Sequence, residues 1–232
     1  MKSLKTYQKP LIFVTIIILI IIAYNSGLLK LLTLENLQNN QDWLTQKRDD
    51  NYTLFALLYT IIYIVSVAFS LPGATILTLT AGLVFGLYGA IFVIIGASIG
   101  AVLTALLTRY LFRDSLEKKF ENQLKTFNQK INKNAVSYLL TLRLIPAFPF
   151  FLINILGGLS RIKLSTFAWT TAIGIIPGTF AFVNAGTQIS KVESVGDILS
   201  PGLIGSFVLL GVIALAPSFF NKKSLLKILS PN

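Results

Sequence analysis

The chain has 232 residues, of which 54% are hydrophobic and 12% charged, and its net charge is +11. A soluble domain carries about 25% charged residues, so this composition excludes an ordinary soluble domain and predicts an all-α integral membrane protein. The chain contains no Cys and no His, which excludes disulfides, thiol nucleophiles, Cys/His zinc sites and imidazole acid–base chemistry.

The first expected element is a transmembrane helix over Leu11–Leu32, which would reach about 33 Å. A signal peptide is the alternative, but the apolar run is too long and no small-x-small cleavage site follows it. The polar segment 35–51 spaces its few apolar residues loosely, which favours an amphipathic helix on the membrane surface. Residues 1–52 therefore form the first expected domain.

A broken pair of apolar segments follows. The run Thr53–Ser70 ends at the break Leu71-Pro72-Gly73, and the next run, Ala74–Phe85, is too short to cross a bilayer. A short apolar segment bounded by Pro and Gly is typical of a re-entrant hairpin, although a hairpin of two full crossings over 53–86 stays open. Tyr88–Phe112 then predicts a clear spanning helix.

The second half has a similar order. After a charged, helical segment outside the membrane, the apolar run Ala135–Leu159 is interrupted by Pro146 and Pro149, which predicts a second re-entrant hairpin. Leu164–Gly186 and Pro201–Phe220 are the last two expected spans. The expected fold therefore has about four transmembrane helices plus two Pro/Gly-broken re-entrant hairpins, with a membrane domain over 53–190 and a C-terminal domain over 191–232.

Basic residues mark one side of the membrane. The N-terminus, the 109–133 segment, the Arg161/Lys163 turn and the C-terminus are basic, which predicts that both termini are cytoplasmic. Because the positive charge flanks apolar runs, we expect membrane lipids with anionic headgroups as partners and no nucleic acid. A short chain without an organelle tail signal favours the bacterial inner (plasma) membrane, and a homo-oligomer stays open.

Weak similarity between the two halves predicts an internal repeat. Pro72 is followed by Gly82 and by Gly96-x-x-x-Gly100, whereas Pro149 is followed by Gly158 and by Gly174-x-x-x-Gly178. In the orientation given by the charges, the first hairpin enters from outside and the second from the cytoplasm, so the repeat is inverted, as in many transporters. The alternative is that apolar sequences share such spacings by chance.

Two stretches carry a resemblance to a known family. The first half has Leu71-Pro72-Gly73 and Ala81–Gly86, and the second has R-x-x-P-x-x-P from Arg143 to Pro149, followed by N-x-x-G from Asn154. Over roughly residues 65–190 the chain resembles the DedA superfamily, also called the SNARE-associated Golgi protein or VTT-domain family. The resemblance implies paired re-entrant hairpins and a role in moving lipids, or lipid-linked phosphates, across a membrane.

The chain departs from the classical DedA pattern in two ways. The stretch Ala68–Thr80 contains no Asp or Glu, so the family's membrane-embedded acidic residues near the first hairpin are missing. The second arginine of the family's paired-arginine motif falls at Pro149. Both departures resemble the Golgi vesicle-protein branch, and they argue against a proton-driven mechanism through carboxylates.

Arg143 is the sharpest candidate for function. An arginine at membrane depth costs about 2.5–3.5 kcal/mol on insertion scales and usually marks a partner, an ion or a substrate. Its guanidinium suits a phosphate group, and the neighbouring prolines place it beside irregular backbone. The alternative is that Arg143 snorkels to the cytoplasmic interface. The expected substrate-binding residues are Arg143, Pro146, Pro149 and Asn154; for Asn154 the alternative is a structural role, in which it bonds backbone carbonyls freed by the prolines.

The remaining candidates have structural interpretations. Arg109 lies near the end of its span and is expected to snorkel, and Asn184 is expected to bond freed carbonyls. The glycines allow close helix packing, and the prolines break helices. The residues in this structural class are Pro72, Gly73, Gly82, Gly86, Gly96, Gly100, Gly157, Gly158, Gly174, Pro177 and Gly178.

Enzyme is the least favoured class. No Ser/His/Asp or Cys/His set is possible, no paired carboxylates lie within a span, and no phosphate-cradling P-loop is present, so we expect no enzyme, no cofactor and no metal site. The leading hypothesis is a flippase-like or scramblase-like protein for a phospholipid or lipid phosphate. The alternatives are a non-transporting membrane-organising or assembly protein and an ion or solute carrier.

Overall fold

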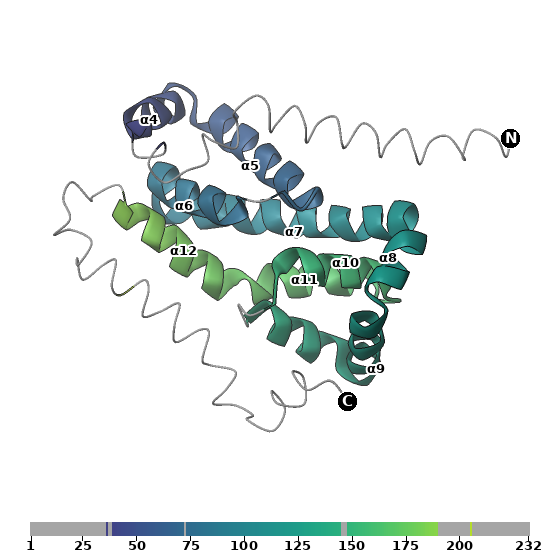
Figure 1. Ribbon diagram of the computed structural model, residues 1–232. Helices are drawn as coiled ribbons and strands as arrows, with labels where there is room; N and C mark the ends of the chain where they lie inside the picture. The colour runs from purple at the N-terminus through teal and green to yellow at the C-terminus, as the bar shows by residue number, and fades with distance from the viewer. Residues whose placement is uncertain (1–35, 37–38, 72, 145–147, 190–204, 206–232) are drawn as a thin grey trace, which may run out of the picture.

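A computed structural model describes residues 36, 39–71, 73–144, 148–189 and 205, and all regular structure among them is helical. The expected N-terminal helix Leu11–Leu32 lies outside the described residues, as do Pro72, Pro146 and, apart from Gly205, the expected last span Pro201–Phe220. Figure 1 shows the helices gathered around one long helix, α7. The helices are α4 (Gln41–Asp50), α5 (Tyr52–Ala68), α6 (Ala74–Phe85), α7 (Gly89–Leu107), α8 (Arg113–Lys119), α9 (Glu121–Leu144), α10 (Phe150–Leu159), α11 (Leu164–Gly174) and α12 (Ile176–Ile189).

The first hairpin consists of α5 and α6. The side chain of Asn51 caps α5 by accepting a hydrogen bond from the Leu54 N–H at 3.1 Å. Between the helices the backbone adopts left-handed conformations, with φ of 54° at Ser70 and 114° at Gly73. The chain then returns along α5, because the Tyr63 hydroxyl lies 3.0 Å from the Thr78 hydroxyl. We call α6 the return helix of this hairpin.

The long helix follows a sharp turn at Gly86, where φ is 62°. The run Ala74–Phe112 is the one stretch of the described chain long and apolar enough to cross a membrane. Since the Gly86 turn separates α6 from α7, the continuous part of this run is α7 with the π-helical turn Thr108–Phe112 that extends it. Helix α5 packs closely on α7, where Gly96 and Gly100 face Tyr63 and Val67.

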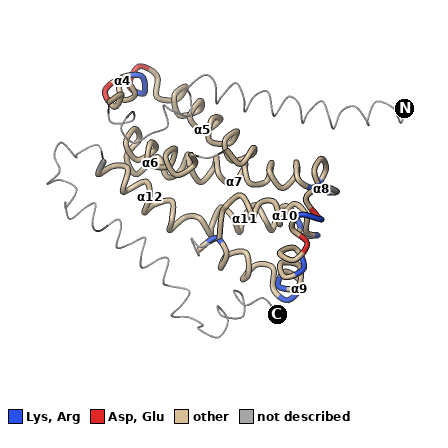
Figure 2. Tube along the Cα trace, in the orientation of Figure 1, with Lys and Arg blue, Asp and Glu red and all other residues tan. Residues whose placement is uncertain are grey.

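The second hairpin begins inside α9. At Asn134 the backbone leaves the helical region (φ −161°, ψ 90°), and the Asn134 side chain accepts a hydrogen bond from the Ser137 N–H at 3.0 Å. Asn134 therefore caps a new helical segment, 135–144, that is set at an angle to the charged segment 121–133. Figure 2 shows charges gathered at α4 and at the α8–α9 end of the molecule. We call α10 the return helix of the second hairpin.

The expected span Leu164–Gly186 is not one straight helix. It is divided into α11 and α12, which are bent by 43° at a break around Ile175. Pro177 explains the break, because its ring has no N–H to donate to Ile173 and clashes with that carbonyl. By length and composition, the described residues contain one helix able to span a membrane, or two if α11 and α12 cross together.

Each return helix packs on the other half of the chain. Helix α6 lies against α12, and Cβ atoms added at Gly82 and Gly186 would lie 1.9 Å from the Val183 carbonyl oxygen and 2.1 Å from the Leu79 carbonyl oxygen, respectively. Helix α10 lies against α7, where a Cβ at Gly158 would lie 2.5 Å from the Ala105 carbonyl oxygen. The two halves therefore interlock through backbone contacts that admit no side chain.

Candidate functional site

Arg143 meets the return helix α10 and helix α11. Its Nη2 atom donates hydrogen bonds to Asn154 Oδ1 and to Thr171 Oγ1, both at 2.8 Å. The carbon of its guanidinium lies 4.5 Å from the centre of the Phe150 ring and 5.2 Å from that of Phe167, so two aromatic faces flank the charge. The site therefore lies where α9, α10 and α11 converge.

A glycine on α11 allows this convergence. A Cβ at Gly174 would lie 2.6 Å from the Cβ of Arg143, so only glycine lets the stem of the arginine lie against α11. Thr171 precedes Gly174 by three residues and therefore lies on the same helix face, beneath the guanidinium. The side chains that contact the guanidinium are therefore set by backbone packing.

The site holds a buried positive charge with unmet donors. Asn154 and Thr171 are both 0% exposed. The Arg143 Nε and Nη1 atoms and the Asn154 Nδ2 atom are buried without a hydrogen-bond partner among the described residues. These three atoms are all N–H donors, and each is costly to leave unmatched.

No carboxylate balances Arg143 within the described part of the chain. The ion pairs found there join Lys47 with Asp50, Arg48 with Asp49 and Arg113 with Glu117. A buried, unpaired guanidinium costs several kcal/mol unless an anion accompanies it. The arrangement is therefore suited to an anion whose oxygens accept several hydrogen bonds.

The structure brings together part of the expected substrate-binding set. Arg143 and Asn154 are in direct contact, while Pro149 is exposed and stands immediately before α10. Sequence reasoning missed Phe150, Phe167 and Thr171, since each sits in an apolar run where aromatic and hydroxyl side chains usually serve packing. The one signal for Thr171 is its spacing from Gly174.

Arg109 contacts the end of α10, a role that the expectation of snorkelling did not include. Its Nε donates to the carbonyl of Gly158 at 3.2 Å, and its Nη2 donates to those of Gly157, Ser160 and Ile162 at 3.4, 3.1 and 3.0 Å. The last carbonyls of a helix lack intrahelical partners and carry partial negative charge, so a cation stabilises them. Arg109 therefore caps the C-terminal end of α10.

The expected structural glycines fall into three groups. Cβ atoms at Gly82, Gly96, Gly100, Gly157, Gly158 and Gly174 would lie 3.0 Å or closer to a neighbour. Gly73 and Gly86 instead supply positive φ values at turns. A Cβ at Gly178 would meet nothing within 4 Å among the described residues, so no close packing is found at that position. Asn184 lies on α12, where its carbonyl accepts a hydrogen bond from Thr187 Oγ1 at 2.7 Å.

Comparison with known proteins identifies the class and then the family. The described fold is helical, and the relatives that the chain matches are named transmembrane proteins, so the chain is an integral membrane protein. The model of the VTT domain matches residues 71–188, and the chain belongs to this family. The match confirms the resemblance to the DedA superfamily noted in the sequence.

Relatives named transmembrane protein 41 place the chain near the Golgi branch of the family. It is 34% identical to the transmembrane protein 41 homolog of Dictyostelium discoideum over 186 residues, covering 78% of this chain and 56% of that protein. It is 26% identical to transmembrane protein 41B of Danio rerio and 24% identical to that of Homo sapiens, covering 65% and 63% of their lengths. The chain thus spans less than two thirds of these relatives. No solved structure matches.

Proposed function

We propose that this protein moves a phospholipid or a lipid-linked phosphate between the two leaflets of a membrane. Arg143 and Asn154 hold the phosphate oxygens during the passage. The observation that carries the proposal is the buried guanidinium of a membrane protein with three unmatched N–H donors around it. A phosphate is a strong acceptor, and charge-assisted hydrogen bonds to arginine are about twice as strong as neutral ones.

The chemistry of the donors favours phosphate over a cation. Arg143 and the Nδ2 of Asn154 can only donate hydrogen bonds, whereas a cation site needs oxygen acceptors. The Phe150 and Phe167 rings flank the guanidinium and limit the access of water. In this dry setting the attraction between guanidinium and phosphate is stronger than in bulk water.

Similar contacts in the two halves of the chain support an inverted repeat, which is part of the proposal. In the first half, Gly96 faces the stem of Tyr63, whose hydroxyl reaches the return helix at Thr78. In the second half, Gly174 faces the stem of Arg143, whose guanidinium reaches the return helix at Asn154. Inverted repeats of broken helices carry substrate sites at their interface in many transporters.

The remaining parts of the proposal follow from charge and composition. Both termini face the cytoplasm, and the basic segment α8–α9 attracts anionic lipids. The protein acts without enzymatic chemistry, without a cofactor and without a coupled carboxylate.

Dithionite quenching of fluorescent phospholipids in reconstituted vesicles tests the proposal. Dithionite reaches only the outer leaflet, so quenching beyond that fraction reports transfer. Wild type is expected to transfer lipid, and Arg143→Gln is expected to slow transfer at least about tenfold, as the loss of a charged contact worth ~1.4 kcal/mol predicts. Arg161→Gln is the matched control, because it makes the same change at an exposed arginine.

Two outcomes would contradict the proposal. Equal transfer by wild type and Arg143→Gln would remove Arg143 from the mechanism. Quenching that stops at the outer leaflet for wild type would exclude scrambling of those lipids and would favour the membrane-organising or carrier alternatives.

A further inference from the structure

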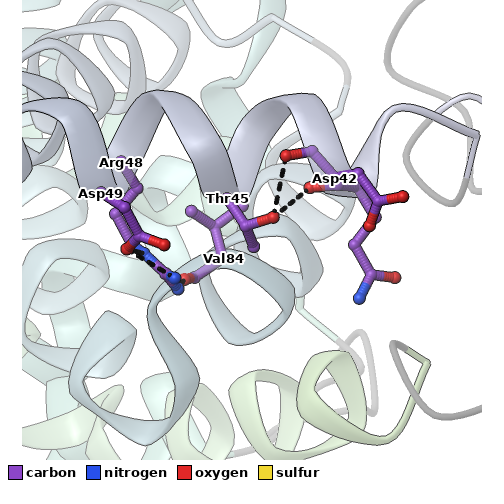
Figure 3. Close-up of polar contacts among 6 residues, drawn as sticks. Asp42, Thr45, Arg48, Asp49 and Val84 are labelled. Atoms are coloured by element: carbon purple, nitrogen blue, oxygen red, sulfur yellow. Dashed lines mark hydrogen bonds and ion pairs between the residues drawn. The ribbon is translucent and has the colours of Figure 1, made fainter.

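An arginine from the segment before each hairpin holds the C-terminal end of that hairpin's return helix. On α4, Arg48 donates a hydrogen bond to the carbonyl oxygen of Val84 near the end of α6, and it pairs with Asp49 at 2.8 Å. Figure 3 shows Arg48 and Asp49 side by side, with the guanidinium directed at Val84. In the second half, Arg109 reaches four carbonyls at and beyond the end of α10.

The return helices that Arg48 and Arg109 contact differ in whether they contribute a residue to the proposed anion site. Helix α10 bears Asn154, which contacts Arg143, and no residue of α6 is part of that contact. Gly157 and Gly158, whose carbonyls accept from Arg109, follow Asn154 by three and four residues. They therefore lie on the same face of α10 as the amide, one turn away.

Helix α10 is placed by α7. A Cβ at Gly158 would lie 2.5 Å from the Ala105 carbonyl oxygen and 2.7 Å from the Thr108 Cβ, so the backbone of α10 rests directly on α7. The π-helical turn Thr108–Phe112 continues α7 and carries Arg109. Such turns recur at functional positions in helices. Helix α7, in the first half of the chain, thus determines the position of Asn154, whereas Arg143 lies on α9 in the second half.

We propose that Arg109 is a positioning residue for the anion site, because it fixes α10 on α7 and so holds Asn154 against Arg143. Helix α10 has only 10 residues, and a helix this short depends on tertiary contacts for its place. Arg109 contacts neither the ligand nor Arg143 and acts only through α10. The role in ligand binding rests on the proposed function, whereas the placement of α10 does not.

The first test measures anion affinity. Purified full-length chain in detergent is titrated calorimetrically with two probes, short-chain phosphatidylglycerol and inorganic phosphate, for wild type, Arg109→Gln, Arg109→Lys and Arg48→Gln. Arg109→Gln is expected to raise Kd about tenfold for both probes, since both present phosphate oxygens to the displaced Asn154. Arg109→Lys recovers part of the affinity, because an ammonium reaches fewer carbonyls.

Arg48→Gln is the matched control. It removes the same kind of helix cap from the return helix that carries no part of the site, so Kd stays within about twofold of wild type while thermal stability falls. A merely structural role for Arg109 predicts the same pattern as Arg48: a lower thermal midpoint with unchanged Kd. That result for Arg109→Gln overturns the proposal.

The second test needs no ligand. Since the chain has no cysteine, Ile153→Cys places a single thiol beside Asn154, at a side chain that is 3% exposed. Its labelling by N-ethylmaleimide is expected to speed up several-fold when Arg109→Gln is added and to stay unchanged when Arg48→Gln is added. If wild type binds neither probe, the proposed function fails, yet this labelling pattern still supports the placement of α10 by Arg109. Equal labelling rates for Ile153→Cys alone, with Arg109→Gln and with Arg48→Gln would overturn the placement of α10 by Arg109.

Discussion

The contact between α6 and α12 predicts a large effect for the smallest possible substitution, Gly82→Ala. An added Cβ would lie 1.9 Å from the carbonyl oxygen of Val183 and 2.9 Å from both the Cα of Gly186 and the backbone N of Thr187. All three neighbours are backbone atoms, so no side-chain rotation relieves the clash. The helices must separate by about 1 Å to restore an ordinary contact in this close-packed region.

The magnitude follows from two opposing terms. Overpacking a closely packed contact costs about 1–3 kcal/mol, and a clash with rigid backbone belongs at the upper end of that range. Alanine recovers about 1 kcal/mol over glycine through its higher helix propensity. The expected net loss is therefore about 2 kcal/mol, which lowers the thermal midpoint by roughly 4–8 °C in a chain of this size.

Gly178→Ala supplies the matched control. It makes the same change within α12, but at a position where an added Cβ meets nothing within 4 Å of it among the described residues. Only the propensity term remains, so Gly178→Ala is expected to raise the midpoint slightly. Thermal unfolding of the purified variants in detergent, followed by circular dichroism, measures both. Equal shifts in the two variants, or a Gly82→Ala midpoint at or above that of wild type, would refute the close approach of α6 and α12.

Four further outcomes follow from single contacts. Thr104→Val removes a buried hydroxyl that bonds carbonyls at the end of α5, and should cost about 1–2 kcal/mol in thermal unfolding. Asn134→Ala removes the cap of segment 135–144 of α9 and should cost about 1 kcal/mol, which Asn134→Ser should largely restore. The hydrogen bond from Arg48 holds the pKa of Asp49 below its ordinary value, so the stability lost in Asp49→Asn is present at neutral pH and vanishes as acid protonates the wild-type carboxylate. Arg143→Met removes a buried unpaired charge but also the donor to Asn154 Oδ1 and Thr171 Oγ1, so the two effects oppose each other and the thermal midpoint should stay near that of wild type while lipid transfer is lost; a large fall in the midpoint would contradict this.

Helix boundaries set by local breakers could be predicted from the sequence. The expected segment Ala74–Phe85 is α6 with the same ends, because Gly73 and Gly86 both adopt positive φ and stop the helix on either side. The run expected from Thr53 likewise begins within a residue of α5, since Asn51 is a strong cap. Such signals act over one or two turns and need no tertiary information.

Features that depend on tertiary contact could not be predicted. The bend between α11 and α12 was not predicted, because transmembrane helices tolerate proline. An apolar run that contains one proline is therefore also typical of a single span. Arg143 and Asn154 carried signals as polar residues in apolar runs, whereas the spacing of Thr171 from Gly174 does not by itself predict that Thr171 accepts a hydrogen bond from Arg143. The contact of Arg109 with α10 was not predicted, because the π-helical turn that carries Arg109 leaves no mark in composition.

The way the halves interlock bears on how a lipid phosphate would pass. Helix α6 of the first hairpin rests on α12, and α10 of the second rests on α7, so each return helix is placed by the opposite half. Rocking of one half against the other, the motion by which inverted-repeat transporters alternate their access, would therefore shift α10 relative to α9. The contact that such a shift would change is the one between Asn154 and Arg143. If the proposed phosphate site lies there, tight binding in one arrangement and loose binding in the other would allow release on the far side.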